Sequence, residues 1–279
     1  MKKSLQDFED KHGQTRVGQL EKALEYAVGN RERLVVDIPS EANTITFGLY
    51  GDNQYGNVHE ATEQYLAYCE RLKAEGITVK LNCGDIFDGH RVYAGQEFEL
   101  HSLGWNAQRN HFINTEPVID GMTTYFITGN HDASLKKLAG VDVGQEIAAL
   151  RPDWQYIGAD YGDITLRTEN GRQYRIRLIH PDGGTAYAIS YKAQQYANSL
   201  DGGTKPHMIG MGHFHKADHL PCYRNMDIIQ AGCFEWQTPF MSRKGSAAHV
   251  GGWIVRVTVG DEKSMSNSIR AEFMAFYKR

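Results

Sequence analysis

Side chains able to bind metal ions follow five short apolar runs of the sequence, within a few residues of the end of each run. They are carboxylates, an amide and imidazoles: Asp52, Asp85, Asn130 with His131, His180, and His213 with His215. Carboxylates offset the charge of divalent cations, and imidazole nitrogens and amide oxygens complete the coordination. Two ions about 3.5–4 Å apart can hold a phosphate and activate a hydroxide for in-line attack. The residue types therefore favour a two-metal site that acts on a phosphoester.

The apolar runs are predicted to be strands that alternate with helices. Residues 44–52 and 77–85 are rich in β-branched and aromatic side chains, and residues 58–76 between them have apolar side chains at helical spacing. Strand, helix and strand within about thirty residues indicate a βαβ unit with parallel strands. Further predicted elements are a helix at 96–111, strands at 123–130, 174–180 and 207–215, and antiparallel β-structure at 251–259.

Parallel strands would bring the polar groups together from distant parts of the sequence. In open α/β sheets the carboxyl ends of the strands form the binding crevice, so we expect the groups at one edge of a central sheet. Glycine precedes most of them, at Gly51, Gly84, Gly129 and Gly212, and would permit the sharp turn that frees the next side chain from the sheet.

The chain is expected to consist of an N-terminal helical segment, residues 1–40, and one α/β domain, residues 41–279. Four apolar residues of the segment share a helical face: Leu20, Leu24, Ala27 and Val28. Such a helix would either pack on the domain or serve as an arm for oligomerisation.

Composition and charge exclude several classes of protein. The chain has 279 residues, of which 41% are hydrophobic, and a net charge of −4, with 30 Lys+Arg against 34 Asp+Glu. These values are typical of a globular protein without the basic field that non-specific nucleic-acid binding requires. We expect neither a membrane span nor a signal peptide, because no sufficiently long apolar stretch occurs. Four cysteines without a C-x-x-C pair favour a reducing, cytoplasmic compartment.

The order of the motifs resembles that of the calcineurin-like metallophosphoesterases. In that family D-x-H, GDxxD, GNH[DE], a lone His and GHxH follow one another. The corresponding residues here are Asp52, Gly84-Asp85 with Asp88, Gly129-Asn130-His131-Asp132, His180, and Gly212-His213 with His215. Four of the five motifs match, over roughly residues 44–240. The resemblance implies an α/β fold with a β-sandwich core, flanked by helices and containing βαβ units.

The resemblance also implies a role for each motif residue. Asp85 would bridge two divalent metal ions, Mn²⁺ by preference, with Mg²⁺, Fe²⁺ or Zn²⁺ as alternatives. The first ion would bind Asp52 and His215, and the second would bind Asn130, His180 and His213. His131 would stand over the phosphate as general acid or transition-state stabiliser, and Asp132 would orient its ring. Asp88 is expected beside the metals rather than on them.

The first motif departs from the family pattern, because Asp52-Asn53-Gln54 stands where the family has D-x-H. D-x-Q is a variant of this motif in the family, so the amide oxygen of Gln54 would bind the first metal. An amide oxygen is harder than imidazole and suits Mn²⁺ or Mg²⁺ better than Zn²⁺. Alternatively the position is vacant, or His59 fills it.

Three segments resemble uncharacterised phage and microbial members of the same family: residues 84–100, 180–195 and 231–244. This resemblance links the chain to the branch that contains DNA-repair nucleases and the small subunit of archaeal family D DNA polymerase. It implies a nuclease that cleaves DNA phosphodiesters by attack of a metal-bridging hydroxide. Candidate substrate contacts are His90, Tyr93 and Tyr187, together with Arg243 and Lys244.

Two other functions remain open from the sequence. A hydrolase of small nucleotides or phosphomonoesters is favoured by the near-neutral charge. A catalytically weak binding or assembly subunit is supported by loss of the D-x-H histidine. Retention of His131, which chemistry needs and metal binding does not, argues against that subunit.

Overall fold

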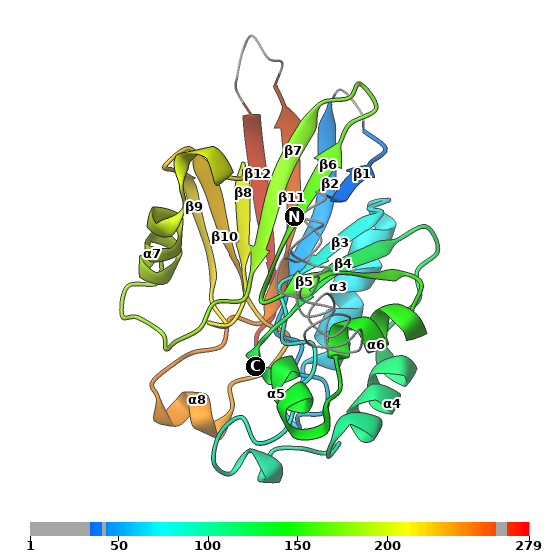
Figure 1. The fold of residues 1–279 in the computed structure, drawn as a ribbon, viewed down its shortest axis with the longest axis vertical. Coiled ribbons are helices and arrows are strands. Elements are labelled where there is room, and N and C mark those ends of the chain that lie inside the picture. The colour runs from blue at the N-terminus through cyan, green and yellow to red at the C-terminus, as the bar shows by residue number, and fades with distance from the viewer. Residues whose placement is uncertain (1–33, 41–42, 261–266, 279) are drawn as a thin grey trace, which may run out of the picture. The chain divides into compact units, whose positions relative to one another are not determined.

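The computed structural model describes residues 34–40, 43–260 and 267–278 (Figure 1). Most of the expected N-terminal helical segment, residues 1–33, lies outside this part. Residues 34–37 of that segment form a strand, β1 (Leu34–Asp37). No helix in the described residues is long and apolar enough to cross a membrane.

Two mixed six-stranded sheets form the framework of the described domain. The first sheet has the strand order β12 (Asn267–Ala275), β11 (Gly251–Val259), β2 (Thr44–Tyr50), β3 (Val79–Asn82), β4 (Thr123–Thr128) and β5 (Trp154–Ala159). The second has the order β1, β6 (Tyr161–Arg167), β7 (Gln173–Ile179), β8 (Met208–Met211), β10 (Met226–Ala231) and β9 (Ala217–Tyr223). Strands β2, β3, β4 and β5 are mutually parallel, and so are β7, β8 and β10.

The two sheets pack face to face through one apolar core. Side chains such as Phe47 of β2 and Leu81 of β3 belong to the same buried cluster as Leu166 of β6 and Ile176 of β7. Strand β7 alternates between buried and more exposed residues, as expected of a strand with one face on the core. The sandwich that the family resemblance implied is therefore confirmed.

Helices cover the outer faces of both sheets (Figure 1). Helix α3 (Thr62–Ala74) buries Tyr65, Tyr68, Cys69 and Leu72 in a cluster that includes Ile254 of β11. The helices near β4 and β5 are α4 (Trp105–Thr115), α5 (Asn130–Ala139) and α6 (Val143–Leu150). Near β9 and β10 lies α7 (Tyr191–Ser199), and a short helix α8 (Pro239–Arg243) follows β10. Apolar side chains of α3, α4, α5, α6 and α7 thus join buried clusters that contain strand residues.

Two sequence expectations need correction. The helix expected at 96–111 is divided into a 3₁₀ turn η1 (Gln96–Phe98) and α4, because Gly104, with φ +78°, stands between them. The five strands that carry polar ends also do not share one central sheet, since β7 and β8 belong to the second sheet. The antiparallel structure expected at 251–259 is confirmed: β11 pairs with both β12 and β2.

Candidate metal centre

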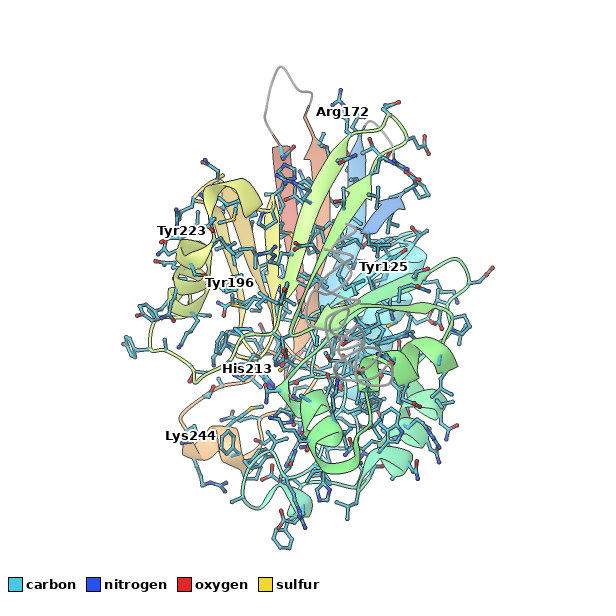
Figure 2. All side chains as sticks on the ribbon, in the orientation of Figure 1. Tyr125, Arg172, Tyr196, His213, Tyr223 and Lys244 are labelled. Atoms are coloured by element: carbon cyan, nitrogen blue, oxygen red, sulfur yellow. The ribbon has the colours of Figure 1, made fainter. Side chains whose placement is uncertain are left out.

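The candidate centre lies where loops from both sheets meet. Asp52, Asp85 and Asn130 follow β2, β3 and β4 of the first sheet, and His180 and His213 follow β7 and β8 of the second. Figure 2 shows His213 near these strand ends, with Lys244 of the α8 region below it. Backbone hydrogen bonds join the loops. The Asp52 N–H donates to Gly84 O (2.9 Å), and the His213 N–H donates to Asp52 Oδ2 (3.0 Å). The two sheets therefore contribute to a single site.

The backbone at the predicted ligands is strained. Five of the eleven non-glycine residues with positive φ in the described part are predicted ligands: Asp52 (51°), Gln54 (51°), Asp85 (50°), His213 (79°) and His215 (52°). Residues with side chains seldom adopt this left-handed region, and each instance costs about 1–3 kcal/mol. Such strain persists only where the surrounding structure enforces it, and it concentrates at functional sites. The pattern supports the grouping of these five residues into one site.

The glycines before the ligands are needed more for space than for freedom of the backbone. Only Gly84 of the four has a positive φ, 91°. A Cβ on Gly129 would lie 2.3 Å from Asp85 Oδ1, and one on Gly212 would lie 2.5 Å from Cys83 O. The expectation that glycine permits sharp turns holds at Gly84. At Gly129 and Gly212 it is the absence of a side chain that lets two loops approach.

Asp85, His180 and His213 form a group whose ligand atoms all lie within 4.8 Å of one another. His180 Nδ1 lies 2.8 Å from the carbonyl of Cys83, which can only accept, so Nδ1 carries a proton. His180 Nε2 then faces two oxygens, Asp85 Oδ2 at 3.0 Å and Asn130 Oδ1 at 3.1 Å. A neutral imidazole would present a lone pair to both. Either a second proton or a cation must therefore lie between them, and a divalent ion fits this donor set.

Charges within the group shift the pKa values of its members. Burial alone would lower the pKa of His180, but the Asp85 carboxylate raises it to about 9. Burial would raise the pKa of Asp85, whereas His180 and His131 hold it well below its usual range. Burial and the neighbouring His180 lower the pKa of His213. Its Nε2 lies 2.7 Å from Gly183 O, which leaves Nδ1 available as a ligand.

His215 lies between two carboxylates. Its Nε2 is 3.3 Å from Asp52 Oδ1, and its Nδ1 is 3.4 Å from Glu235 Oε2. The buried Nδ1 has no hydrogen-bond partner among the described residues. Burial above all raises the pKa of Glu235 to about 8. Glu235 orients a predicted ligand, yet it was not among the site residues that we predicted. The one signal was its place in the 231–244 segment that resembles other family members.

Gln54 is buried and reaches Asp85. The orientation of its amide that makes the most hydrogen bonds is the one in which the nitrogen donates to Phe87 O and Asp88 Oδ1, each at 3.2 Å. In that orientation the amide oxygen stands 3.4 Å from Asp85 Oδ2. Two facing oxygens of this kind suit a cation. His59 lies in the following turn, where its backbone bonds Asn57 and Trp236. Gln54 rather than His59 therefore has the geometry of a ligand.

His131 is the second residue of α5, and its ring is held by Asp88, not by Asp132. Nδ1 lies 2.7 Å from Asp88 O and 3.4 Å from Asp88 Oδ1, so Nε2 is left for other partners. Burial would lower the pKa of His131, but the charge of Asp85 and the bonds to Asp88 raise it to about 10. A divalent cation on Asp85 would offset part of that negative charge.

The role expected of Asp132 needs correction. Its carboxylate accepts the N–H groups of Ile86 (3.2 Å), Phe87 (2.9 Å) and Gly129 (2.9 Å). Burial and the nearby Asp85 raise its pKa to about 7. Asp132 thus fixes the backbone of the loop after β3 and the start of α5. The sequence could not reveal this, because Asp132 stands next to His131 in the chain while Asp88 is distant.

The candidate substrate residues lie in three different settings. The Tyr93 ring is 6.4 Å from that of His131 and stacks on Phe240 of α8 at 4.7 Å. Tyr187 is fully exposed and borders a hollow of about 200 Å³ that also contains Lys192 and Lys216. The His90 N–H donates to Ser134 Oγ (2.9 Å). Tyr93 is thus the member of this set that stands beside His131.

No protein-family profile and no curated protein matches the sequence. Solved structures that it resembles include GAP50 of Plasmodium, described as the anchor in the inner membrane complex, with TM-score 0.49, 12% identity, and coverage of 83% of this chain and 84% of that one. Vps29 from Cryptosporidium parvum has a TM-score of 0.42 and 12% identity, and the match covers 84% of this chain and 99% of that one. A dimetal phosphatase from Danio rerio has a TM-score of 0.40 and 11% identity, and the match covers 83% of this chain and 98% of that one.

The fold follows from the strand order and from the positions of the motifs. Two mixed six-stranded sheets pack together, and helices flank them. The metal-ligand motifs occupy the loops after β2, β3, β4, β7 and β8, in the order that the family signature has along the chain. The protein has a two-sheet α/β sandwich fold in which the predicted ligands from both sheets lie in loops at one site.

Proposed function

We propose that this chain hydrolyses phosphodiesters at a centre for two divalent metal ions, with DNA as its substrate and Mn²⁺ as its metal. The observation that carries the proposal is the position of Asp85. Its Oδ2 faces His180 Nε2 on one side (3.0 Å) and the Gln54 amide on the other (3.4 Å). A carboxylate between two sets of ligands is the arrangement that a bridging ligand requires.

The residues on the two sides would hold one ion each. Asp52, Gln54 and His215 form the first set; Asn130, His180 and His213 form the second; Asp85 is shared. When bound, divalent ions supply Lewis-acid stabilisation of the phosphate charge and lower the pKa of water. A phosphate held by these residues would face His131, whose Nδ1 is bonded to Asp88 O and whose Nε2 would donate to the leaving oxygen.

The loops on this side of the sheets favour a polyanionic substrate. Basic residues occur in the segments that follow β3, β7, β8 and β10, in loops and in the helices α7 and α8: Arg91, Lys192, Lys216, Arg243 and Lys244. A backbone with several phosphates would contact several of these cations at once, which the net charge of −4 for the whole chain does not prevent. Tyr93 and Phe240 add an aromatic surface beside His131, suited to stacking with a base.

A second candidate function is hydrolysis of small nucleotides. It is favoured by the hollow of about 200 Å³, because a space of this size with Lys192 and Lys216 in its wall suits one phosphate group and its substituent. The geometry gives less support to a non-catalytic subunit. Gln54 takes the position of the lost histidine, and Asp88 holds the His131 ring, which metal binding alone would not need.

The test is a substrate panel with Mn²⁺. Purified protein is assayed on a chromogenic phosphodiester, a phosphomonoester, cyclic nucleotides, and single- and double-stranded DNA, with Asp85→Asn as control. The proposal expects cleavage of DNA and of the chromogenic diester, and near-complete loss in the control. Cleavage of cyclic or mononucleotides without DNA would select the second candidate. No turnover of any substrate by metal-loaded protein would contradict both.

A further inference from the structure

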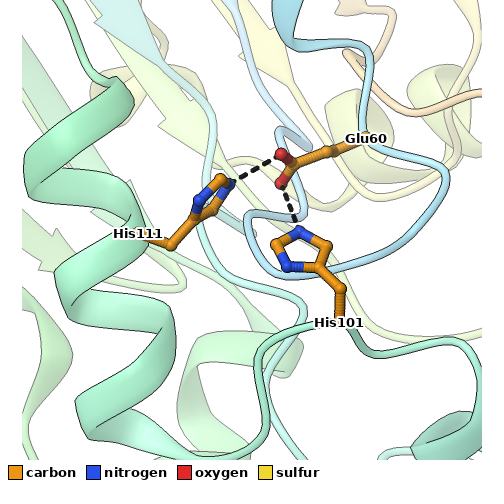
Figure 3. A group of neighbouring side chains, drawn as sticks. All are labelled: Glu60, His101 and His111. Atoms are coloured by element: carbon orange, nitrogen blue, oxygen red, sulfur yellow. Dashed lines mark hydrogen bonds and ion pairs between the residues drawn. The ribbon is translucent and has the colours of Figure 1, made fainter.

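A second group of ligand-type side chains lies outside the candidate centre (Figure 3). Glu60 precedes α3, His101 follows η1, and His111 lies on α4. His111 Nε2 is 2.6 Å from Glu60 Oε1, and His101 Nε2 is 3.5 Å from Glu60 Oε2. The two imidazole rings are 4.7 Å apart and nearly perpendicular, at 83°. Both rings thus direct Nε2 toward one carboxylate, each from a different segment of the chain.

The other ring nitrogens are held by hydroxyl groups. His101 Nδ1 is 3.0 Å from Ser102 Oγ, and His111 Nδ1 is 3.5 Å from Thr115 Oγ1. A hydroxyl can accept the Nδ1 proton in the tautomer whose Nε2 binds a metal ion, and it can donate to Nδ1 in the tautomer whose Nε2 donates to Glu60. Metal-binding histidines usually have a partner at the second ring nitrogen. The hydroxyls therefore supply that partner when an ion is bound.

The backbone fixes the three residues relative to one another. The Val58 N–H donates to Glu99 O (2.8 Å), and the His101 N–H donates to Gly56 O (2.9 Å). The Glu60 carboxylate accepts from the Gly56 N–H (3.0 Å) and from Thr62 Oγ1 (2.9 Å), which sets its orientation. Its side chain is 13% exposed, and the histidines are 35% and 25% exposed. The group is therefore preorganised, partly shielded, and still open to an ion from solvent.

We propose that Glu60, His101 and His111 bind one transition-metal ion of the Zn²⁺ type. Two imidazoles and a carboxylate form a three-ligand set that leaves a fourth position for water. Ligand atoms about 2.0–2.1 Å from a tetrahedral ion are separated by about 3.3 Å, close to the 3.5 Å between His101 and Glu60. The ion takes the place of the proton that His111 Nε2 directs at Glu60, and the neutral ring then carries its one proton on Nδ1, next to Thr115 Oγ1.

The ion would stabilise the local structure and would take no part in a reaction. Glu60 pairs with Glu235 in a backbone bridge, and the Ala61 N–H donates to Phe234 O (2.7 Å). Glu235 in turn approaches His215 of the candidate centre. An ion on Glu60 would therefore fix the loop after Gln54 and the segment behind His215. The inference does not depend on the proposed reaction.

The experiment measures Zn²⁺ stoichiometry by calorimetry and elemental analysis on the full chain. All variants are made in the Asp85→Asn protein, called the parent, so that the candidate centre contributes less to the measured Zn²⁺ binding. His101→Ala and Glu60→Gln are compared with a matched control, His219→Ala. His219 also faces a carboxylate, Asp227 at 3.2 Å, but belongs to no three-ligand group among the described residues.

We expect the parent and His219→Ala to bind one more Zn²⁺ than His101→Ala or Glu60→Gln. Zn²⁺ should also raise the melting temperature of the parent more than that of His101→Ala.

Equal stoichiometry and affinity in the parent and His101→Ala would overturn the inference and leave a hydrogen-bonded His–Glu–His group. Equal loss in His219→Ala would also overturn it, since it would indicate unspecific binding by surface histidines. Melting of the metal-free variants checks folding. Glu60→Gln keeps one acceptor oxygen for the Gly56 N–H, and its amide nitrogen can donate to Thr62 Oγ1, so this variant tests the carboxylate charge separately if His101→Ala is unstable.

Discussion

The molecule contains two buried polar clusters along β3 and the loop after it, and they differ in how their charges are matched. Within β3, Lys80 Nζ bonds Tyr65 OH (2.8 Å) and Glu116 Oε1 (3.1 Å), and Tyr55 OH bonds Glu116 Oε2 (2.8 Å). Donors and acceptors are balanced and the charges cancel. Burial alone would lower the pKa of Lys80, but Cys69 and Glu116 raise it further above its usual range.

The cluster at the end of the strand has no such balance. Oxygens of Asp85 and Gln54 face each other, oxygens of Asp85 and Asn130 both face His180 Nε2, and His215 Nδ1 has no hydrogen-bond partner among the described residues. The backbone there is strained, whereas Lys80 lies in a regular strand. Burial of ionisable groups therefore does not distinguish a functional site. An excess of acceptors held by strained backbone is the feature that separates the two clusters, and it is the feature that the proposed metal centre would explain.

Loss of the central carboxylate should produce the largest effect. Asp85→Asn removes the shared ligand, and we expect activity to fall by about 10³-fold or more, since metal ions contribute several kcal/mol to the transition state. Mn²⁺ should no longer raise the melting temperature. Elemental analysis of Mn²⁺-reconstituted wild-type protein provides the reference. Absence of bound metal in the wild type would refute the metal centre.

Disruption of the cluster around Lys80 and Glu116 should lower the stability of the fold rather than the activity. Lys80→Ala leaves Glu116 buried without its partner, so the free energy of unfolding should fall by about 3–5 kcal/mol. Denaturant titration measures this loss. Lys80→Met with Glu116→Leu, which removes both charges, should recover much of it. If Lys80→Ala reduced activity without loss of stability, the distinction between the two clusters would fail.

His131→Ala tests the acid role and should cost about 10²–10⁴-fold. A nitrophenolate leaving group needs little protonation, whereas a sugar alkoxide needs much. The loss should therefore be far larger on a nucleotide phosphodiester than on a nitrophenyl ester, with both metals retained. Equal losses would indicate that His131 positions the phosphate. Loss of metal would show that it is a ligand.

The two clusters should also respond differently to pH in metal-free protein. The folded pKa of His180 is raised to about 9 from an ordinary 6.5, so its contribution is complete below pH 6.5 and is lost as pH rises through 9. The loss should reach at most about 3 kcal/mol. Unfolding of chelator-treated wild type and His180→Asn across pH 6–9 measures it. The destabilisation caused by Lys80→Ala should remain constant over that range.

The smallest expected effect concerns Gln54. Gln54→His should strengthen binding at the first metal or shift preference toward Zn²⁺, by about tenfold, because imidazole is a softer ligand than an amide oxygen. Competition between Mn²⁺ and Zn²⁺ provides the measurement. A metal-loaded structure in which water or His59 occupies the position would contradict the role of Gln54.

The sequence was sufficient to predict where strands end in polar residues and that several of these residues come together. Residues 44–52, 77–85 and 123–130 combine apolar runs with a terminal polar group, and local pattern alone defines them. The distribution of strands between two sheets was not predictable, because pairing depends on contacts distant in sequence. For the same reason Asp88 could not be assigned to His131, nor Glu235 to His215.

Lys80 illustrates a different limit. It stands in a run of β-formers, and nothing in the pattern distinguishes a lysine paired in the core from one at the surface. Its partner, Glu116, follows α4 and is 36 residues away in the sequence. Tertiary structure alone reveals such a pair, and the same is true of Glu60 with His101 and His111.

The left-handed backbone at Asp52, Gln54, Asp85, His213 and His215 has a consequence for the life of the protein in a cell. Each of these residues raises the free energy of the folded chain, and bound metal would repay that cost only in the native state. Chains that lack metal would open more often around these loops and would be cleared sooner by proteases. If the centre binds metal as proposed, the supply of divalent cations would set how many copies of the protein persist, in addition to how fast each copy works.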